Sequence, residues 1–409
     1  MRPVDMGEEH DTMLWRTEAV GRMLDARQSA LARQSVETIA LGEGIGGRVL
    51  AEEIVAEENV PAFDHATMDG YAFDTADEYP LELIDSEVFP EDEPPTLESG
   101  EAVRIATGAP LPERATAVLK EEVATVRDRQ LNGPDLESGT YTYGRASNVT
   151  AGETLFEAGE RLSAKDAILL QDLGYETVDV REVFSVALLA TGSEIHEGKT
   201  SDLDSWMLAE LLRSWGHKAT YEGTVPDEYE RVEDRIGDLA QEYDVVLTTG
   251  GTSVGKKDHV IQALGALGQI DFHRVRIRPG KPIALAELPE TTVVAVPGKP
   301  VGAHTIVTLI ARPLFLGGNT ALPTINASVT QRVDIGPDGF EYAVPVQFED
   351  GAAIPFGHVS SSLRVYEETF DPSVLSSSTR ATRADGFFIT DHAVKQDETV
   401  EVVPYEVLE

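Results

Sequence analysis

The strongest constraint on the fold is an alternation of apolar runs and amphipathic segments between residues 183 and 318. Strand patterns occupy 183–192, 218–226, 244–251 and 291–298, and helical patterns occupy 204–216, 228–243, 257–268 and 301–318. Short loops join the two kinds of segment. This alternation is typical of a doubly wound α/β domain with a mostly parallel sheet, in which ligands bind at the carboxyl ends of the strands.

The pattern changes on both sides of this α/β domain, which we place at 183–320. Residues 46–144 show short strand-like runs and many turns, which predicts an inserted β-rich domain. The insertion would interrupt a helical, discontinuous first domain at 1–45 and 145–182. Residues 321–409 return to strand-type alternation and predict a C-terminal β domain. The expected class is therefore α/β plus β, in four domains.

The composition narrows the choice of partners. The chain carries 72 acidic and 33 basic residues, a net charge of −39, and the acids are spread along its length. We therefore expect a solvated acidic surface, as in proteins from a very salty cytoplasm, and no nucleic-acid partner, because phosphate contacts need a basic face. The absence of cysteine excludes a disulfide framework. An apolar run long enough for a membrane span is also missing, so we expect a cytoplasmic protein.

One segment departs from this acidic trend. Residues 251–300 contain seven basic residues and four acidic ones. A local surplus of cations in so acidic a chain predicts an anion site. The alternative is that some of these cations only decorate strand edges.

The stretch "VVLTTGGTSVGKKDH" at 245–259 would supply the anion site with its loop. Its glycines let backbone N–H groups approach an anion, and the helix beginning near Asp258 adds its positive end. The spacing matches the P-loop pattern G-x-x-x-x-G-K, but Lys257 stands where a P-loop needs a hydroxyl for Mg²⁺. We therefore expect a nucleotide or phosphorylated ligand without a true P-loop. A plain strand–helix turn and an unrelated nucleotide hydrolase remain the alternatives.

The loop "TTGGTSVGKKDH" resembles the TTGGTSVG-x-x-D-Y signature of the MoeA family, the molybdopterin molybdenumtransferases. Four further stretches resemble family motifs in the family's order: "PAFDHATMDGYAF" (61–73), "RIATGAPLPERATAVLKEE" (104–122), "LLATGSEI" (188–195), and "IRPGKPIA" (277–284) with "VPGKPVGA" (296–303). The resemblance covers nearly the whole chain.

The resemblance implies a reaction and an assembly. The family takes adenylated molybdopterin and molybdate, uses Mg²⁺, releases AMP and leaves the metal on the dithiolene. Its members are elongated homodimers of four domains, in which the inserted domain reaches toward the partner's α/β site. Tungstate is an alternative oxyanion, since both ions are tetrahedral dianions of nearly equal size.

The resemblance also implies roles for individual residues. The expected catalytic residues are Asp69, Thr107, Glu194, Asp227 and Asp258, of which the last three would hold Mg²⁺ and position water for cleavage of the phosphoanhydride. Arg278 and Lys281 would clamp the oxyanion. The other expected substrate-binding residues are Thr248, Gly250, Gly251, Ser253, Gly255, Asp204, Pro297, Pro300 and Ser361.

Several positions depart from the family pattern: Asn148 for Asp, Asp204 for Asn, His259 for Tyr, Arg278 for Lys, Lys299 for Asn and Val344 for an arginine. Arg364 lies close in sequence to Val344 and could replace the lost charge. These substitutions leave a second hypothesis open. The chain could be a diverged paralogue that inserts tungstate, or one that only binds the pterin nucleotide as a non-catalytic binding protein.

Overall fold

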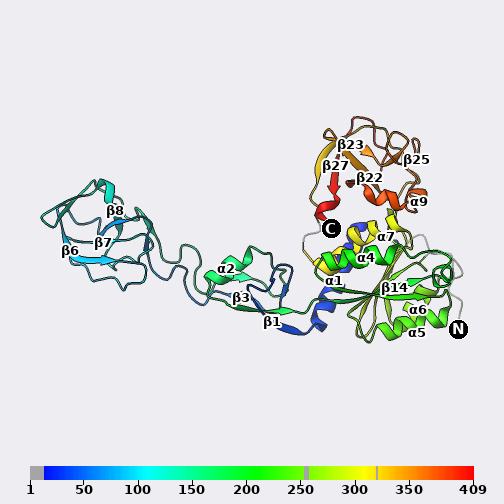
Figure 1. Ribbon diagram of the computed structural model, residues 1–409, viewed down its shortest axis with the longest axis horizontal. Coiled ribbons are helices and arrows are strands. Elements are labelled where there is room, and N and C mark those ends of the chain that lie inside the picture. The colour runs from blue at the N-terminus through cyan, green and yellow to red at the C-terminus, as the bar shows by residue number, and fades with distance from the viewer. Residues whose placement is uncertain (1–12, 253–257, 319–320) are drawn as a thin grey trace. The chain divides into compact units, whose positions relative to one another are not determined.

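The computed structural model describes residues 13–252, 258–318 and 321–409 (Figure 1). The described residues of Met1–Glu37 and Arg181–Glu409 form one compact unit, and Thr38–Val180 forms a second. Among the described residues, no helix combines the length and the apolar character needed to cross a bilayer.

A six-stranded sheet lies at the centre of the first unit. Its strands run in the order β15 (Lys218–Val225), β14 (Ser185–Thr191), β16 (Val245–Thr249), β20 (Thr292–Val296), β19 (Ala284–Glu287) and β17 (Gln269–His273). The first four strands are parallel to one another. Strand β19 pairs antiparallel with β20, and β17 pairs antiparallel with β19, so β19 alone runs against the others. The predicted doubly wound, mostly parallel sheet is confirmed; the antiparallel strand was not predicted.

Helices cover both faces of this sheet (Figure 1). One face carries α4 (Asp204–Ser214) and α7 (Pro300–Ile306), and the other carries α5 (Tyr229–Leu239) and α6 (His259–Leu267). The second pair buries Val232, Ile236 and Leu264 against Val246 of β16. Because both faces are covered, the central strands β14, β16 and β20 are mostly apolar along their length and show no alternation of apolar and polar residues.

The helix predicted at 301–318 is broken into three pieces. A π-helical turn, Val307–Ala311, separates α7 from α8 (Arg312–Leu316). Pro313 stands at the start of α8 and lacks the N–H that would continue the hydrogen-bond ladder of the preceding helix. The break therefore lies where the proline predicts one.

The long N-terminal helix α1 (Arg16–Arg33) belongs to the first unit. Nη1 of its buried Arg27 donates to the carbonyl oxygens of Leu314 (3.0 Å) and Phe315 (2.7 Å) at the end of α8. The predicted first domain instead grouped this helix with 145–182. The burial of Arg27 against α8 explains the difference, and the predicted domain boundaries otherwise stay predictions.

The second unit contains the β-rich insertion. Its six-stranded sheet has the order β8 (Ala117–Lys120), β5 (Gly70–Phe73), β7 (Glu101–Ile105), β6 (Leu81–Val88), β10 (Gln130–Asn132) and β9 (Thr125–Arg127). The rest of this unit forms smaller sheets, namely β1 (Val36–Ala40) with β13 (Thr177–Arg181) and β2 (Val49–Leu50), β3 (Ile54–Val55) with β12 (Thr154–Phe156), and β4 (His65–Ala66) with β11 (Thr142–Tyr143).

The prediction that the discontinuous first domain is helical was wrong for its part in the second unit. Within Thr38–Val180, which is described throughout, α2 (Asp166–Asp172) is the one α-helix. In β13, Val178 and Val180 are buried while Thr177 and Asp179 are exposed. This alternation is the two-residue period of a half-buried strand. The helical pattern of α2 therefore does not extend to the rest of 145–182.

A C-terminal β domain is present, as predicted, and its sheet closes on itself, which was not predicted. Its sheet has the order β18 (Ile277–Arg278), β22 (Glu341–Glu349), β23 (Ala352–Pro355), β21 (Ile325–Val329), β27 (Thr399–Pro404) and β26 (Gly386–Thr390), and β22 also pairs with β26. A two-stranded ladder, β24 (Gly357–His358) with β25 (Arg364–Tyr366), and the short helix α9 (Pro372–Leu375) complete it. Strand β18 comes from the α/β domain, so this pairing joins the two domains beside the predicted cation clamp.

Candidate active site

A cavity of about 520 Å³ lies where the parallel strands of the first unit end. Six predicted site residues line it: Glu194, Gly250, Gly251, Arg278, Lys281 and Pro297. They come from the segments that follow β14, β16 and β20, from the end of β18 and from the loop after it. The cavity thus lies at the carboxyl edge of the sheet, where ligands of doubly wound domains bind.

Close backbone packing explains the glycines of this edge. Gly250 and Gly251 have positive φ angles, 82° and 63°. A Cβ atom on Gly250 would lie 2.6 Å from the carbonyl oxygen of Thr191, and one on Gly298 would lie 3.0 Å from the Cα atom of Gly250. The loops after β14, β16 and β20 therefore touch through their backbones, with no side chain between their peptide groups. The N–H of Gly250 itself donates to the carbonyl oxygen of Val296 at 3.1 Å.

The charged side chains at the cavity wall are mostly cationic. Arg278, Lys281 and Lys299 face a single carboxylate, that of Glu194, among the described residues that line it. Nζ of Lys299 donates to the carbonyl oxygen of Ser373 at 3.1 Å, which holds this side chain against α9. The cavity thus carries a surplus of positive charge in a chain whose net charge is −39, as expected for a site that binds anions.

Two of the predicted metal ligands lie near each other at this edge. Asp227 follows β15, and Asp258 is the N-cap residue of α6. Each has a buried Oδ1 atom without a hydrogen-bond partner. Burial raises the pKa of Asp258 to about 6, and the neighbouring Asp227 carboxylate adds to the rise. Neither residue lines the cavity, and the described chain contains no group of three metal-ligating side chains.

Asp204 is buried at the start of α4, close to the glycine loops. Its side chain is 6% exposed and its Oδ1 atom has no partner. Its Oδ2 atom lies 4.0 Å from the position that a Cβ atom would take on Gly298. Burial, followed by the charge of Asp202, raises the pKa of Asp204 to about 7. A buried carboxyl group next to an anion site is thus poised to be neutral at moderate pH.

Comparison with known proteins identifies the family of this chain. The family description "MoeA N-terminal region (domain I and II)" matches residues 16–174, and "Probable molybdopterin binding domain" matches residues 187–316. A molybdopterin molybdenumtransferase of Haemophilus influenzae is 31% identical over 284 residues, which cover 66% of this chain and 69% of the relative. The chain belongs to the MoeA family.

Other MoeA relatives support the same assignment. A molybdopterin molybdenumtransferase of Synechococcus elongatus is 29% identical over 308 residues, which are 69% of this chain and 75% of the relative. The crystal structure of a MoeA protein involved in molybdopterin biosynthesis, from Pyrococcus horikoshii, matches with a TM-score of 0.72 and 26% identity. This match covers 96% of our chain and 99% of that structure. The multidomain fold is therefore that of MoeA proteins.

The MoeA motifs of the second unit bring Asp69 and Thr107 together. The backbone N–H and the hydroxyl group of Thr107 both donate to Oδ1 of Asp69, at 2.7 Å each. These two bonds, the backbone one first, hold the pKa of Asp69 below its usual value, so the exposed carboxylate stays ionised. The two predicted catalytic residues thus form one local pair.

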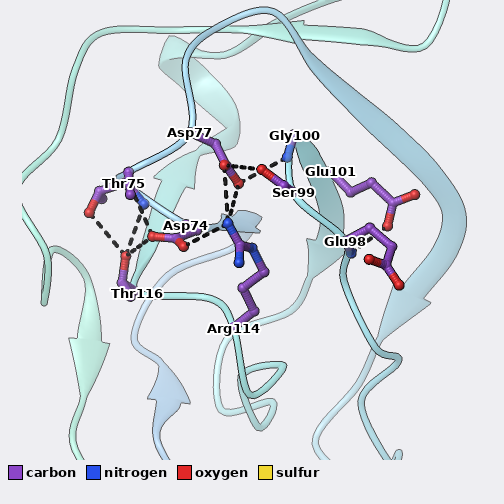
Figure 2. Close-up of polar contacts among 10 residues, drawn as sticks. Asp74, Thr75, Asp77, Glu98, Ser99, Gly100, Glu101, Arg114 and Thr116 are labelled. Atoms are coloured by element: carbon purple, nitrogen blue, oxygen red, sulfur yellow. Dashed lines mark hydrogen bonds and ion pairs between the residues drawn. The ribbon is translucent and has the colours of Figure 1, made fainter.

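A polar network braces the loop that follows this pair (Figure 2). Nη2 of Arg114 lies 3.1 Å from Oδ1 of Asp77 and 3.2 Å from Oδ2 of Asp74. Asp77 also accepts hydrogen bonds from the Ser99 hydroxyl at 2.7 Å and from the Gly100 N–H at 3.0 Å. The arginine of the "GAPLPERA" motif therefore has a structural role within its own unit.

The structure separates Ser361, Val344 and Arg364 from the cavity. Val344 is fully buried in β22, opposite Phe388 of β26, and Arg364 is exposed on β25. The hydroxyl group of Ser361 donates within its own turn, to the carbonyl oxygens of His358 and Leu363. None of the three lines the described cavity. The expectation that Arg364 compensates for Val344 therefore finds no support.

The departure at Asn148 has a local explanation. Its Nδ2 atom donates to Oδ2 of Asp172 at 2.8 Å. An aspartate at this position would place a second carboxylate against that of Asp172. The amide therefore removes a repulsion that the family's usual residue would create here.

The remaining predicted residues are distributed as follows. Pro300 is the first residue of α7, and Thr248 is fully buried in β16 with an unpartnered hydroxyl. Ser253 and Gly255 fall outside the described residues. Sequence reasoning missed Pro372, Ser373 and Ser376, which line the cavity from α9 and the residue after it. The sequence "DPS" at 371–373 could have indicated this helix, because Asp followed by Pro is typical of a helix start. In the structure, Asp371 caps α9.

Proposed function

We propose that this protein transfers molybdenum from molybdate to adenylated molybdopterin and releases AMP, with Mg²⁺ as its metal cofactor. The observation that carries the proposal is the cationic cavity at the carboxyl ends of β14, β16 and β20, with its exposed glycine backbone. A pyrophosphate-linked nucleotide needs close N–H donors, and a small dianion needs paired cations. The cavity combines paired cations with a glycine loop that a phosphate can approach closely.

The roles follow from the side chains. Arg278 and Lys281 bind the oxyanion, and the phosphates lie against the loop of Gly250 and Gly251, where no Cβ atom blocks their close approach. Glu194 is the carboxylate of the cavity wall, and it orients the water that attacks the phosphoanhydride. Thr252 offers a hydroxyl group at the same wall.

The residues present fit a magnesium site. Asp227 and Asp258 each keep a buried oxygen atom without a partner, and a bound Mg²⁺ commonly uses one or two carboxylates together with waters and substrate phosphates. These two residues would hold the ion, and waters and substrate phosphates would complete its coordination. The third predicted ligand, Glu194, forms no metal-ligating group with them among the described residues. When bound, Mg²⁺ would neutralise charge on the phosphate oxygens. We further propose a homodimer in which Asp69 and Thr107 act on the substrate that the partner holds.

The alternative is a paralogue that inserts tungstate or only binds the pterin nucleotide. Val344 favours it, because the position where the family carries an arginine is buried in β22 and offers no charge.

The test is AMP release from adenylated molybdopterin in high salt with Mg²⁺, with molybdate or tungstate added in turn. We expect release that depends on molybdate, and a loss of at least about ten-fold in kcat/KM for Lys281→Ala. Lys395→Ala, at an exposed turn, is the matched control. Release that depends only on tungstate, or tight binding without release, would replace the proposal by the alternative. Hydrolysis of ATP without any pterin would overturn both.

A further inference from the structure

Arg278 and Lys281 share one aromatic ring, that of Phe340. The guanidinium carbon of Arg278 lies 4.3 Å from the ring centroid, and Nζ of Lys281 lies 5.8 Å from it. Both distances fall within the range of a cation–π attraction. Phe340 does not line the cavity, whereas both cations do.

The backbone holds this ring in place from the other domain. The residue after Phe340 begins β22, and the N–H of Glu341 donates to the carbonyl oxygen of Arg276 at 2.8 Å. Strand β22 then pairs in parallel with β18, with Arg278 opposite Tyr342. Glu341 also forms an ion pair with Arg16 of α1, with 3.1 Å between Nε and Oε2. The half-buried Phe340 is therefore fixed relative to both cations by neighbouring strand contacts.

An aromatic ring beside the two cations favours oxyanion binding more than a carboxylate at the same place would. Two cations brought close together repel each other, and proteins commonly relieve this repulsion with a carboxylate. A carboxylate would cancel the positive charge and compete with the bound oxyanion. The negative face of a ring attracts the cations without adding net charge. Among the described residues, no carboxylate forms an ion pair with Arg278.

We propose that Phe340 is a positioning residue that sets the placement of Arg278 and Lys281 and thereby the affinity of the site for the tetrahedral oxyanion. The identity of that oxyanion rests on the proposed function. The contacts of Phe340 with Arg278 and Lys281 do not depend on it. Phe340 acts through the two cations and does not touch the substrate. The C-terminal β domain thus contributes to oxyanion binding without supplying a charge of its own.

The test is calorimetric titration of molybdate alone into the full-length protein and its variants. Phe340→Leu should weaken binding by about three- to thirty-fold, whereas Phe340→Tyr should stay within about two-fold of wild type and Phe340→Trp should bind at least as tightly. Phe348→Leu is the matched control, because it makes the same change further along β22. Equal weakening by Leu, Tyr and Trp would show a packing effect and overturn the inference.

A kinetic measurement separates this inference from the proposed function. In the AMP-release assay, Phe340→Leu should raise the KM for molybdate and leave the KM for adenylated molybdopterin and the kcat at saturating molybdate unchanged. If wild type shows no oxyanion-dependent release, the proposed function fails, and the titrations still decide the inference. If wild type is active and Phe340→Leu has an unchanged molybdate KM and affinity, the inference fails alone.

Discussion

At the scale of single residues, Asp204 is a predicted substrate-binding residue whose buried environment disfavours its charged form. The family's usual asparagine is neutral and can donate a hydrogen bond. Asp204 can do the same only while it is protonated, and its raised pKa of about 7 makes this the main form below neutral pH. Because the group lies beside the glycine loops, its ionised form would also repel an anionic ligand.

This environment predicts a pH-dependent stability. The folded state holds a proton on Asp204 up to about pH 7, whereas the unfolded chain releases it near pH 3.8. The folded state therefore binds more protons in this window, and its stability falls as the pH rises through it. Asp204→Asn should remove this loss. Between pH 5.5 and pH 8, the free energy of unfolding of the wild type should therefore fall by on the order of 1–2 kcal/mol more than that of the variant.

Urea denaturation at both pH values measures this gain. Asp350→Asn, at an exposed turn, serves as the control, and its free energy of unfolding should change with pH as that of the wild type does. If the free energy of unfolding of Asp204→Asn also changes with pH as that of the wild type does, Asp204 does not titrate in this window.

At the scale of elements, α9 shows how a short helix can complete a site. The helix has four residues, too few to be stable alone, and its start is stabilised by Asp371. Oδ1 of Asp371 accepts from the N–H groups of Ser373 (2.9 Å) and Val374 (3.1 Å). Ser373 lines the cavity and its carbonyl oxygen binds Lys299, so the cap also determines where that cation lies.

Removal of the cap should therefore affect both stability and activity. Asp371→Ala should cost about 1 kcal/mol of unfolding free energy, as loss of an N-cap usually does. It should also raise the KM for adenylated molybdopterin. Asp371→Ser keeps a capping oxygen and should retain most of both properties. Denaturation midpoints and KM values check this, and an equal effect of Ala and Ser would show that capping is not the cause.

At the scale of the whole molecule, the net charge of −39 acts on every part of the chain. Several of the described ion pairs are exposed and contribute little, so the excess of carboxylates is left to solvent and salt. Mutual repulsion within the folded protein then favours expansion at low ionic strength. The cationic cavity is a local exception to this field and would attract anions all the more strongly at low salt.

The expected result is a thermal midpoint that rises by several degrees between about 0.05 M and 1 M KCl, as the Debye length falls from more than 10 Å to about 3 Å. Differential scanning calorimetry without ligand would measure it. The gain should level off above about 1 M, because screening is then nearly complete. A midpoint that does not change with salt would show that the surface carboxylates do not limit stability.

The sequence by itself determined the α/β core and its ligand edge. The runs at β14, β16 and β20 are mostly apolar and contain no charged residue, and such runs predict buried parallel strands from local composition alone. The glycines after them are equally local signals, because the strained backbone of Gly250 and Gly251 tolerates little else. The ordered motifs then indicated the family.

Only the tertiary structure decided which side chains meet. It buried Asp204 and Val344, paired Asp69 with Thr107, and left Ser361 in a turn away from the cavity. It also placed Phe340 against Arg278, and α9 at the cavity wall. Except for the turn of Ser361, these outcomes depend on residues that are distant in the chain. Periodicity describes only the neighbours of a residue along its own element, whereas burial and charge at a site sum over every element that packs there.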